Sequence, residues 1–295
     1  MEEFALFFKR QFPDLLSECP YNAAKCCTVG CGGRYAGAVY PRSFTEMIAV
    51  VDFCQENGIR YYVLGCGSNV LPLDGENQPL LIFTRYLVGG SFGKDPLVYA
   101  GVTVGAFLKD CEKHGRSGGE FLAGIPATIG GAAFMNAGVR DRRFDEIVKN
   151  VIVYDKGELR SYPKADCGYS YKRSRFMEEG GVIFAVIFDL EETTSEIVAD
   201  RKREYLQKRE WLPKGRSMGC VFKNPDGDSA GRLIEGAGLK GLRNGGAVVS
   251  ETHANFIIND NNATAKDIIA LIGLIKNAVY AQYGIALEEE IRRLE

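Results

Sequence analysis

The chain contains two glycine-rich segments whose bare backbone could come close to a bound molecule. The first, Gly65-Cys66-Gly67-Ser68-Asn69, directly follows the apolar run of residues 62–64. Because glycine lacks a Cβ atom, successive amide N–H groups in such a turn can converge on an anion such as a phosphate. A tight turn after a strand has the same composition, and a GxG pattern alone does not separate the two interpretations.

The second segment covers residues 118–138, GGEFLAGIPATIGGAAFMNAG, and has almost no bulky polar side chain. A flat aromatic cofactor needs such a lining, in which glycines admit the ring, Ile125 and Pro126 form a stiff apolar wall, and Thr128 and Asn136 offer hydrogen bonds. A glycine-rich helix that packs against a sheet is the alternative interpretation. The presence of a second loop of this kind favours a cofactor site over two unrelated turns.

Helices and strands that alternate along the chain must hold these loops in place. Residues 44–54 carry apolar side chains at helical spacing between a Ser43/Glu46 capping box and an Asn57-Gly58 stop, which predicts a helix. A shorter helix is predicted over 104–111. Strands, two of them in a hairpin around Lys156-Gly157, are predicted at residues 59–64, 80–83, 147–154, 159–162 and 182–190.

The composition changes after Leu190. Residues 191–210 are dense in charge and predict a solvated helix of about five turns, so we place a domain boundary there. The last part of the chain predicts helices near 230–237 and 268–279 and strands at 247–250 and 255–258. The tail carries Glu288, Glu289 and Glu290, which cannot all face one way.

Composition argues against several classes of function. The chain has 36 basic and 38 acidic side chains, so no overall positive field favours nucleic acid or an anionic membrane as the main partner. Nine cysteines without CxxC pairs favour reduced thiols in a cytosol, and His114 and His253 lie in unrelated segments, so we expect no metal site. The apolar stretch at the N-terminus is too short for a signal peptide or a membrane span, and it predicts an amphipathic helix.

The two loops together resemble a known family. GxGSN at 65–69 and EFLAGIPxTIGGAxxMNAG at 120–138 are similar to the FAD-binding domain of the UDP-N-acetylenolpyruvoylglucosamine reductases, flavoenzymes that complete UDP-N-acetylmuramate in peptidoglycan synthesis. Later segments extend the resemblance in the family's order. Residues 171–176, 219–225, 230–241, 250–259 and 287–291 resemble the family's YRxSxF, GSVFKNP, AGxLIExxGLKG, SxxHANFIVN and LxPEV.

The resemblance implies an α+β architecture. Residues 21–192 would form a two-subdomain FAD-binding fold of the PCMH (vanillyl-alcohol-oxidase-like) type, with subdomains at about 21–85 and 86–192. A C-terminal α+β substrate-binding domain would cover 193–295, and residues 1–20 would form an N-terminal helix that packs on the body.

The resemblance also implies a two-stage hydride transfer. NADPH would reduce FAD, and the reduced flavin would give hydride to C3 of the enolpyruvyl group of UDP-N-acetylglucosamine enolpyruvate. Charge then develops at C2 and in the carboxylate, so the site must stabilise that charge and deliver one proton. The family's proton-donating serine falls on Cys220, its YRxS arginine on Lys172, and its LxPEV glutamate on Glu290.

Two of these three positions differ from the family's usual residue. A thiol, with an unperturbed pKa of about 8.5, is a stronger acid than a serine hydroxyl, although an inert core thiol is the alternative for Cys220. Lys172 keeps the positive charge but lacks the two-pronged guanidinium, and a shift of one residue would let Arg173 serve instead. The register favours Lys172. Glu290 is in register and could hold a proton or polarise the substrate carboxyl if burial raises its pKa.

The remaining motif positions are expected to hold the cofactor and the substrate. Residues expected to cradle the FAD pyrophosphate are Gly65, Gly67, Ser68 and Asn69, and those expected to line the flavin are Gly124, Ile125, Pro126, Thr128, Gly130, Gly131, Asn136 and Gly138. Candidates for the UDP-sugar are Tyr171, Lys223, Asn224 and Lys240, and His253 could orient the site or be a structural histidine. No histidine stands where some relatives of this fold attach flavin, so we expect FAD held without a covalent bond.

The sequence therefore predicts a cytoplasmic FAD enzyme that acts on a UDP-sugar and NADPH, as a monomer or weak homo-oligomer, with no nucleic acid or membrane partner. Two alternatives stay open. Another flavin oxidoreductase of the same fold would act on a different substrate, although the matches in the last third of the chain count against it. A flavin- or UDP-sugar-binding protein that has lost catalysis is suggested by Cys220 and Lys172.

Overall fold

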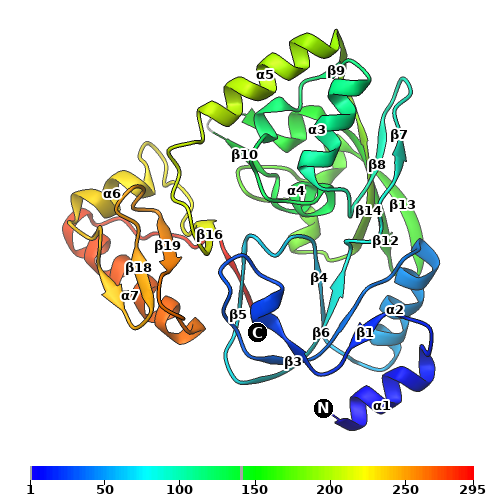
Figure 1. The fold of residues 1–295 in the computed structure, drawn as a ribbon, viewed down its shortest axis with the longest axis horizontal. Helices are drawn as coiled ribbons and strands as arrows, with labels where there is room; N and C mark the ends of the chain where they lie inside the picture. Colours follow the sequence, from blue (N-terminus) through cyan, green and yellow to red (C-terminus); the bar gives the residue numbers. More distant parts are fainter. Residues whose placement is uncertain (1, 140–141) are drawn as a thin grey trace.

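The computed structural model describes residues 2–139 and 142–295, and only the backbone of residues 2–4. Met1, the first residue of the predicted N-terminal helix, lies outside the described residues. Figure 1 shows three parts: a lower one with α1, α2 and β1–β6, an upper one with α3–α5 and β7–β14, and a third, on the left, with α6, α7 and β16–β19. No helix within the described ranges has the length and apolar character that a membrane span requires.

The lower part is a sheet that α2 covers. β3, β6 and β4 run parallel in this order, with β1 and β2 antiparallel on β3. Ser43 caps α2 as predicted, because its side chain accepts a hydrogen bond from the Glu46 amide at 3.1 Å. The N-terminal helix is shorter than the predicted 1–20 segment. The elements are α1 (Glu2–Gln11), β1 (Ser17–Glu18), β2 (Tyr21–Asn22), β3 (Arg34–Val39), α2 (Phe44–Glu56), β4 (Tyr61–Leu64), β5 (Val70–Pro72) and β6 (Glu76–Phe83).

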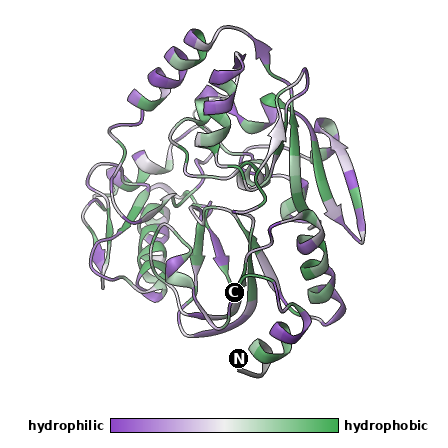
Figure 2. Ribbon diagram, turned by 45° about the vertical axis from the view of Figure 1, so that its right-hand side comes forward, coloured by the Kyte–Doolittle hydropathy of each residue, from purple (hydrophilic) through white to green (hydrophobic). Residues whose placement is uncertain are grey.

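The upper part is an antiparallel sheet in the order β13-β12-β14-β8-β7. The predicted hairpin is confirmed, with Asp155 opposite Glu158. Figure 2 shows hydrophobic residues along the central strands, and α4 packs on β14. The elements are β7 (Gly90–Ser91), β8 (Leu97–Tyr99), α3 (Val104–Lys113), β9 (Arg116–Ser117), α4 (Ile129–Met135), β10 (Gly138–Val139), β11 (Arg142–Arg143), β12 (Val148–Asp155), β13 (Glu158–Pro163), β14 (Val182–Phe188), β15 (Glu191–Glu192) and α5 (Ser195–Gln207).

The charged segment after Leu190 forms a shorter helix than predicted, and one side of it is packed. Residues 191–192 pair with β9 instead of joining the helix. Val198 of α5 is fully buried, Arg201 donates to the Ser117 hydroxyl at 2.6 Å, and Lys202 forms an ion pair with Glu112 on α3. By its packing, α5 therefore belongs with the upper sheet.

The third part is an antiparallel sheet, β16-β19-β18-β17, against α6 and α7. The apolar stripe predicted for the long helix is buried, and Gly284 ends that helix in a left-handed conformation, φ 69°. The tail then returns to the lower part, where β20 pairs in parallel with β5. The elements are β16 (Ser217–Cys220), α6 (Ala230–Gly236), β17 (Arg243–Asn244), β18 (Ala247–Val249), β19 (Phe256–Asn259), α7 (Ala265–Tyr283) and β20 (Arg292–Leu294).

Candidate active site

A cleft of about 1560 Å³ lies where the three parts meet. Both glycine loops line it, together with the turn at 171–172, the segment 208–215 and Glu290. All the predicted cofactor residues are among its walls: Gly65, Gly67, Ser68, Asn69, Gly124, Ile125, Pro126, Thr128, Gly130, Gly131, Asn136 and Gly138. Residues far apart in the sequence therefore share one cavity.

The first glycine loop needs its glycines because other backbone approaches it closely. Gly67 has φ +63°, and a Cβ atom there would lie 1.9 Å from the carbonyl oxygen of Cys26. A Cβ at Gly65 would lie 2.2 Å from the Thr128 hydroxyl, so the two loops touch at this point. None of the amide N–H groups of residues 66–69 donates to a backbone carbonyl among the described residues. The residues of this loop line the cleft, so these amides are available as donors to an anion there.

The second loop combines the two interpretations left open by the sequence. It ends in α4, whose first turn Thr128 caps by accepting from the Gly131 amide at 3.2 Å. Gly130 donates to the Ala100 carbonyl at 2.9 Å, and a Cβ at Gly130 would lie 2.8 Å from the Ala100 Cβ. The glycines therefore let α4 pack close to the end of β8 while its start still lines the cleft.

Two asparagines expected at the cofactor use their side-chain amides on the protein itself. Asn69 donates to the carbonyl of Glu290 at 3.0 Å. Asn136, which is buried and left-handed at φ 44°, donates to the Ser170 carbonyl at 2.9 Å and accepts from the Asp145 amide at 2.9 Å. Asn69 thus holds the tail in the cleft, and Asn136 holds the turn that carries Lys172.

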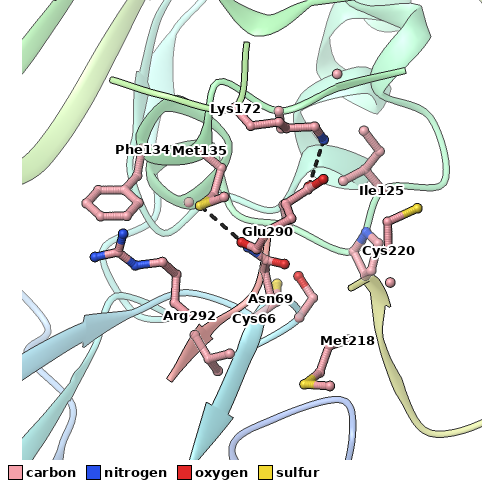
Figure 3. Close-up of a pocket in the computed structure, with 18 of the residues that line it drawn as sticks. Cys66, Asn69, Ile125, Phe134, Met135, Lys172, Met218, Cys220, Glu290 and Arg292 are labelled. Atoms are coloured by element: carbon pink, nitrogen blue, oxygen red, sulfur yellow. Dashed lines mark hydrogen bonds and ion pairs between the residues drawn. The ribbon is translucent and has the colours of Figure 1, made fainter. Parts of the chain in front are cut away.

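The turn after Ser170 directs Lys172 into the cleft and Arg173 away from it. Ser170 and Arg173 exchange two backbone hydrogen bonds of 3.2 Å, and Lys172 between them has φ 54°. The Lys172 Nζ lies 2.8 Å from Oε1 of Glu290, with 17% and 12% of the two side chains exposed (Figure 3). Arg173 pairs instead with Glu178 at the surface and is not among the described residues that line the cleft.

The register of the tail decides which of its three glutamates faces the cleft. The Glu290 amide donates to the Val221 carbonyl at 2.8 Å, and the Lys223 amide donates to the Glu288 carbonyl at 2.9 Å. Glu289, between them, turns away to pair with Lys276 and Arg293. Glu290 therefore enters the cleft and meets Lys172.

The predicted substrate residues divide into two groups. Tyr171, Asn224 and His253 line the cleft, and the Asn224 amide donates to the Tyr171 hydroxyl at 3.3 Å. Lys223 and Lys240 are not among the described lining residues; each forms an ion pair instead, Lys223 with Glu288 at 2.5 Å and Lys240 with Glu235 at 2.7 Å.

Cys220 ends β16 on the wall of the same cleft as Lys172 and Glu290 (Figure 3). Burial, followed by the nearby charge of Glu290, raises the pKa of its thiol to about 11, although Lys172 and Arg209 oppose the shift. At neutral pH the sulfur therefore carries its proton.

Trp211 and Arg209 are among the residues of the cleft that sequence reasoning did not single out. Trp211 is stacked on His253, with ring centroids 5.4 Å apart and planes at 12°. The Arg209 side chain passes over Gly124, where an added Cβ would lie 3.1 Å from Nε. Their place in the segment that leads into β16, and the fact that the chain has just one tryptophan, were the available signals.

A second cavity, of about 940 Å³, adjoins the first at Thr28, Gly65, Cys66 and Thr128, which line both. Lys25 and Arg85 are among its walls, as is Phe92, whose ring stacks on His114 with centroids 5.0 Å apart. The place where the glycine loops touch therefore borders both cavities.

Comparison with known proteins identifies the family. Residues 35–161 match the family described as FAD binding domain, and residues 210–294 match the C-terminal domain of UDP-N-acetylenolpyruvoylglucosamine reductase. The chain is 40% identical over 274 residues to the UDP-N-acetylenolpyruvoylglucosamine reductase of Syntrophobacter fumaroxidans, covering 89% of this chain and 79% of that protein.

Solved structures agree. The crystal structure of the reductase from Thermus caldophilus is 32% identical, with a TM-score of 0.81 over 95% of this chain and 99% of that one. A glucose dehydrogenase, Phl p 4.0202, is 15% identical with a TM-score of 0.50 over 65% of this chain and 44% of its own, and shares the fold alone. The predicted FAD-binding α+β fold is confirmed, and the chain belongs to the UDP-N-acetylenolpyruvoylglucosamine reductase family.

Proposed function

We propose that this cleft catalyses the reaction of the family, the NADPH-dependent reduction of UDP-N-acetylglucosamine enolpyruvate to UDP-N-acetylmuramate through FAD, in peptidoglycan precursor synthesis. The observation that carries the assignment of residues is the 2.8 Å ion pair between Lys172 and Glu290, in the cleft that Cys220 and both glycine loops also line. Cys220 is the proton donor, Lys172 is the cation at the substrate carboxylate, and Glu290 positions Lys172.

The residues present fit FAD. The unpaired amide N–H groups of residues 66–69 suit the pyrophosphate, and Gly124, Ile125 and Pro126 offer an apolar wall for the flavin. The adjoining cavity gives the rest of the molecule room beyond Gly65. When bound, FAD supplies the hydride chemistry between NADPH and the substrate.

Cys220 has the protonation state that the reaction needs. As charge develops at C2 of the substrate, the S–H bond of Cys220 breaks and a C–H bond forms at C2, which leaves a thiolate that regains its proton from solvent. A pKa raised to about 11 keeps the proton on sulfur until that charge develops. The thiol in place of serine is therefore compatible with catalysis.

Lys172 and Glu290 act on the substrate carboxylate. The Lys172 ammonium is mostly buried, so its charge is weakly screened and stabilises negative charge as it accumulates on the carboxylate. Glu290 holds this ammonium in the cleft, and its own backbone is fixed by Val221 and Asn69. We assign Tyr171 and Asn224 to the binding of the UDP-sugar. Lys223 and Lys240 are already paired with carboxylates, so we assign them a structural role in shaping the site.

The domain division is also part of the proposal. The lower and upper parts bind FAD, and the third part binds the substrate. Because α5 packs on α3, we place the start of the substrate domain after Gln207 and not at residue 193, which agrees with the family match that begins at residue 210. We expect a cytoplasmic protein that is a monomer or a weak homo-oligomer, and sedimentation of the purified protein tests the oligomeric state.

Purified protein tests the function directly. Flavin absorbance released on denaturation measures FAD, and NADPH oxidation that depends on UDP-N-acetylglucosamine enolpyruvate measures the reaction. In Cys220→Ala, NADPH should still reduce the flavin while substrate turnover falls by about 10²-fold or more, because general acid catalysis is removed. Unchanged turnover in this variant would refute the proton-donor role, and wild-type flavoprotein inert toward this substrate would favour another flavin oxidoreductase.

A further inference from the structure

The cleft has an exposed aromatic face that the proposed reaction does not use. Trp211 lines the cleft and is 56% exposed, although one face of its indole is stacked on His253. The indole Nε1 donates to the Lys208 carbonyl at 3.0 Å, so the polar edge of the ring is also held. A large ring fixed on one face and open on the other is a platform for a second planar group.

The histidine beneath this ring is held by its own contacts. His253 accepts from the Asn255 amide at 3.2 Å through Nδ1, and its other ring contact is Phe256 at 5.0 Å. Burial lowers the pKa of His253, so the imidazole is neutral at pH 7. Phe256 pairs with Cys220 in the sheet. The platform is thus fixed to the strands that carry the proposed proton donor.

The surroundings of Trp211 favour an anionic ligand. Residues 208–217 carry four cations, Lys208, Arg209, Lys214 and Arg216, against one carboxylate, Glu210. Of the cations that line the cleft, Lys208 reaches Glu204 only at 4.0 Å, and Arg209 meets the Gly124 carbonyl at 3.5 Å. Lys214 has no ion pair among the described residues. An open aromatic face beside weakly paired cations matches a nucleobase joined to phosphates.

We propose that Trp211 stacks the nucleobase of a nucleotide bound in the cleft, with Lys208, Arg209 and Lys214 attracting its phosphates. The inference rests on the proposed function, because both substrates of that reaction are nucleotides that must bring their reacting groups to one centre. The base is either the uracil of the UDP-sugar or the adenine of NADPH, and the same ring chemistry serves both.

Because Trp211 is the single tryptophan of the chain, tryptophan fluorescence of the FAD-loaded protein reports on the surroundings of this one ring. We expect UDP, NADP⁺ or both to change the emission saturably, and inorganic phosphate at equal ionic strength to leave it unchanged. A response to UDP assigns uracil, and a response to NADP⁺ assigns adenine. No response to either nucleotide overturns the proposal, whether or not the protein turns over its substrate.

Kinetics give an independent test. Trp211→Leu should raise KM for the nucleotide that stacks by about tenfold at unchanged flavin content, and Trp211→Phe should recover part of it, because one base–aromatic stack is worth roughly this factor. Tyr280→Leu, which removes a 61% exposed ring from α7, is the matched control and should leave both KM values unchanged. If Trp211→Leu has the wild-type KM for both substrates, the proposal is overturned. An inactive wild-type protein would count against the proposed reaction, and the fluorescence result would then decide whether Trp211 stacks a nucleobase.

Discussion

The two sides of the cleft are built on different principles. On the side that we propose for the cofactor, the glycine loops offer backbone: Gly65 and Gly67 leave no room for a Cβ, and residues 65–69 resemble the family pattern. On the side that we propose for the substrate, the proposed roles belong to side chains, and two of the three positions, Lys172 and Cys220, differ from the residues that the family pattern has there.

The difference shows how a site can change. A backbone cradle fails when a single methyl group is added, because the neighbouring carbonyl cannot move away cheaply. A side-chain site tolerates exchange when its neighbours adjust the new group. Here the cleft keeps the Cys220 thiol protonated, and Glu290 supports the single ammonium of Lys172 in place of a guanidinium.

The largest effect is expected on the cofactor side. Gly67→Ala should abolish FAD binding or folding, because the new Cβ would meet the Cys26 carbonyl at 1.9 Å. Gly58→Ala is the matched control: its φ of +62° is almost the same, but nothing lies within 4 Å of its Cβ. The control should lose only the left-handed backbone cost of about 1–2 kcal/mol in free energy of unfolding. Flavin content measures FAD binding, and denaturant unfolding measures the free energy of unfolding. Equal values for the two variants would contradict the view that the backbone of this loop needs Gly67 for lack of space.

On the substrate side, Lys172→Met should lower turnover by about 10²-fold, because a preorganised charge at the developing carboxylate is lost and Glu290 is left unpaired. Lys172→Arg, which restores the family's usual residue, should stay within about tenfold of wild type. Reduction of the flavin by NADPH, followed by stopped-flow absorbance, should change little in either variant. If Lys172→Met kept full turnover, the assigned role would be wrong.

A smaller effect is expected at Cys220. Cys220→Ser should keep turnover within about tenfold of wild type, since the cleft already holds a neutral proton donor.

With a pKa of about 11, the Cys220 thiol is the thiolate in about one molecule per thousand at pH 8. Inactivation by iodoacetamide should therefore be slow at pH 8 and speed up as pH rises toward 11, and Cys220→Ser should escape it. Rapid inactivation of the wild type at pH 7, absent in Cys220→Ser, would show that the thiol is ionised.

Local sequence signals predicted most helices, strands and turns, whereas contacts between residues that are distant in sequence could not be predicted. The cap at Ser43, the hairpin around Lys156-Gly157 and the strand before Gly65 depend on neighbouring residues, so the sequence was enough. The amide of Asn136 is used by Ser170 and Asp145, which are remote in sequence, and spacing could not reveal it.

The same limit applies to the charged residues and to α5. The carboxylate of Glu288, which holds Lys223 from 65 residues away, becomes visible only when the tail is folded back. The charge density of residues 191–210 reports the exposed side of α5 but not the buried Val198 that docks it on the upper sheet. Composition therefore predicted a domain boundary before α5, whereas the packing of α5 supports the proposed boundary after Gln207.

The smallest effect is expected at Arg173, the residue next to Lys172. Arg173→Ala removes the alternative cation, whose partner Glu178 is exposed at the surface, and surface ion pairs contribute little, so turnover and flavin content should stay within about twofold of wild type. The contrast with Lys172→Met, measured in the same assay, separates the two neighbours. Loss of turnover in Arg173→Ala with full activity in Lys172→Met would mean that the turn after Ser170 changes when substrate binds and brings Arg173 into the cleft.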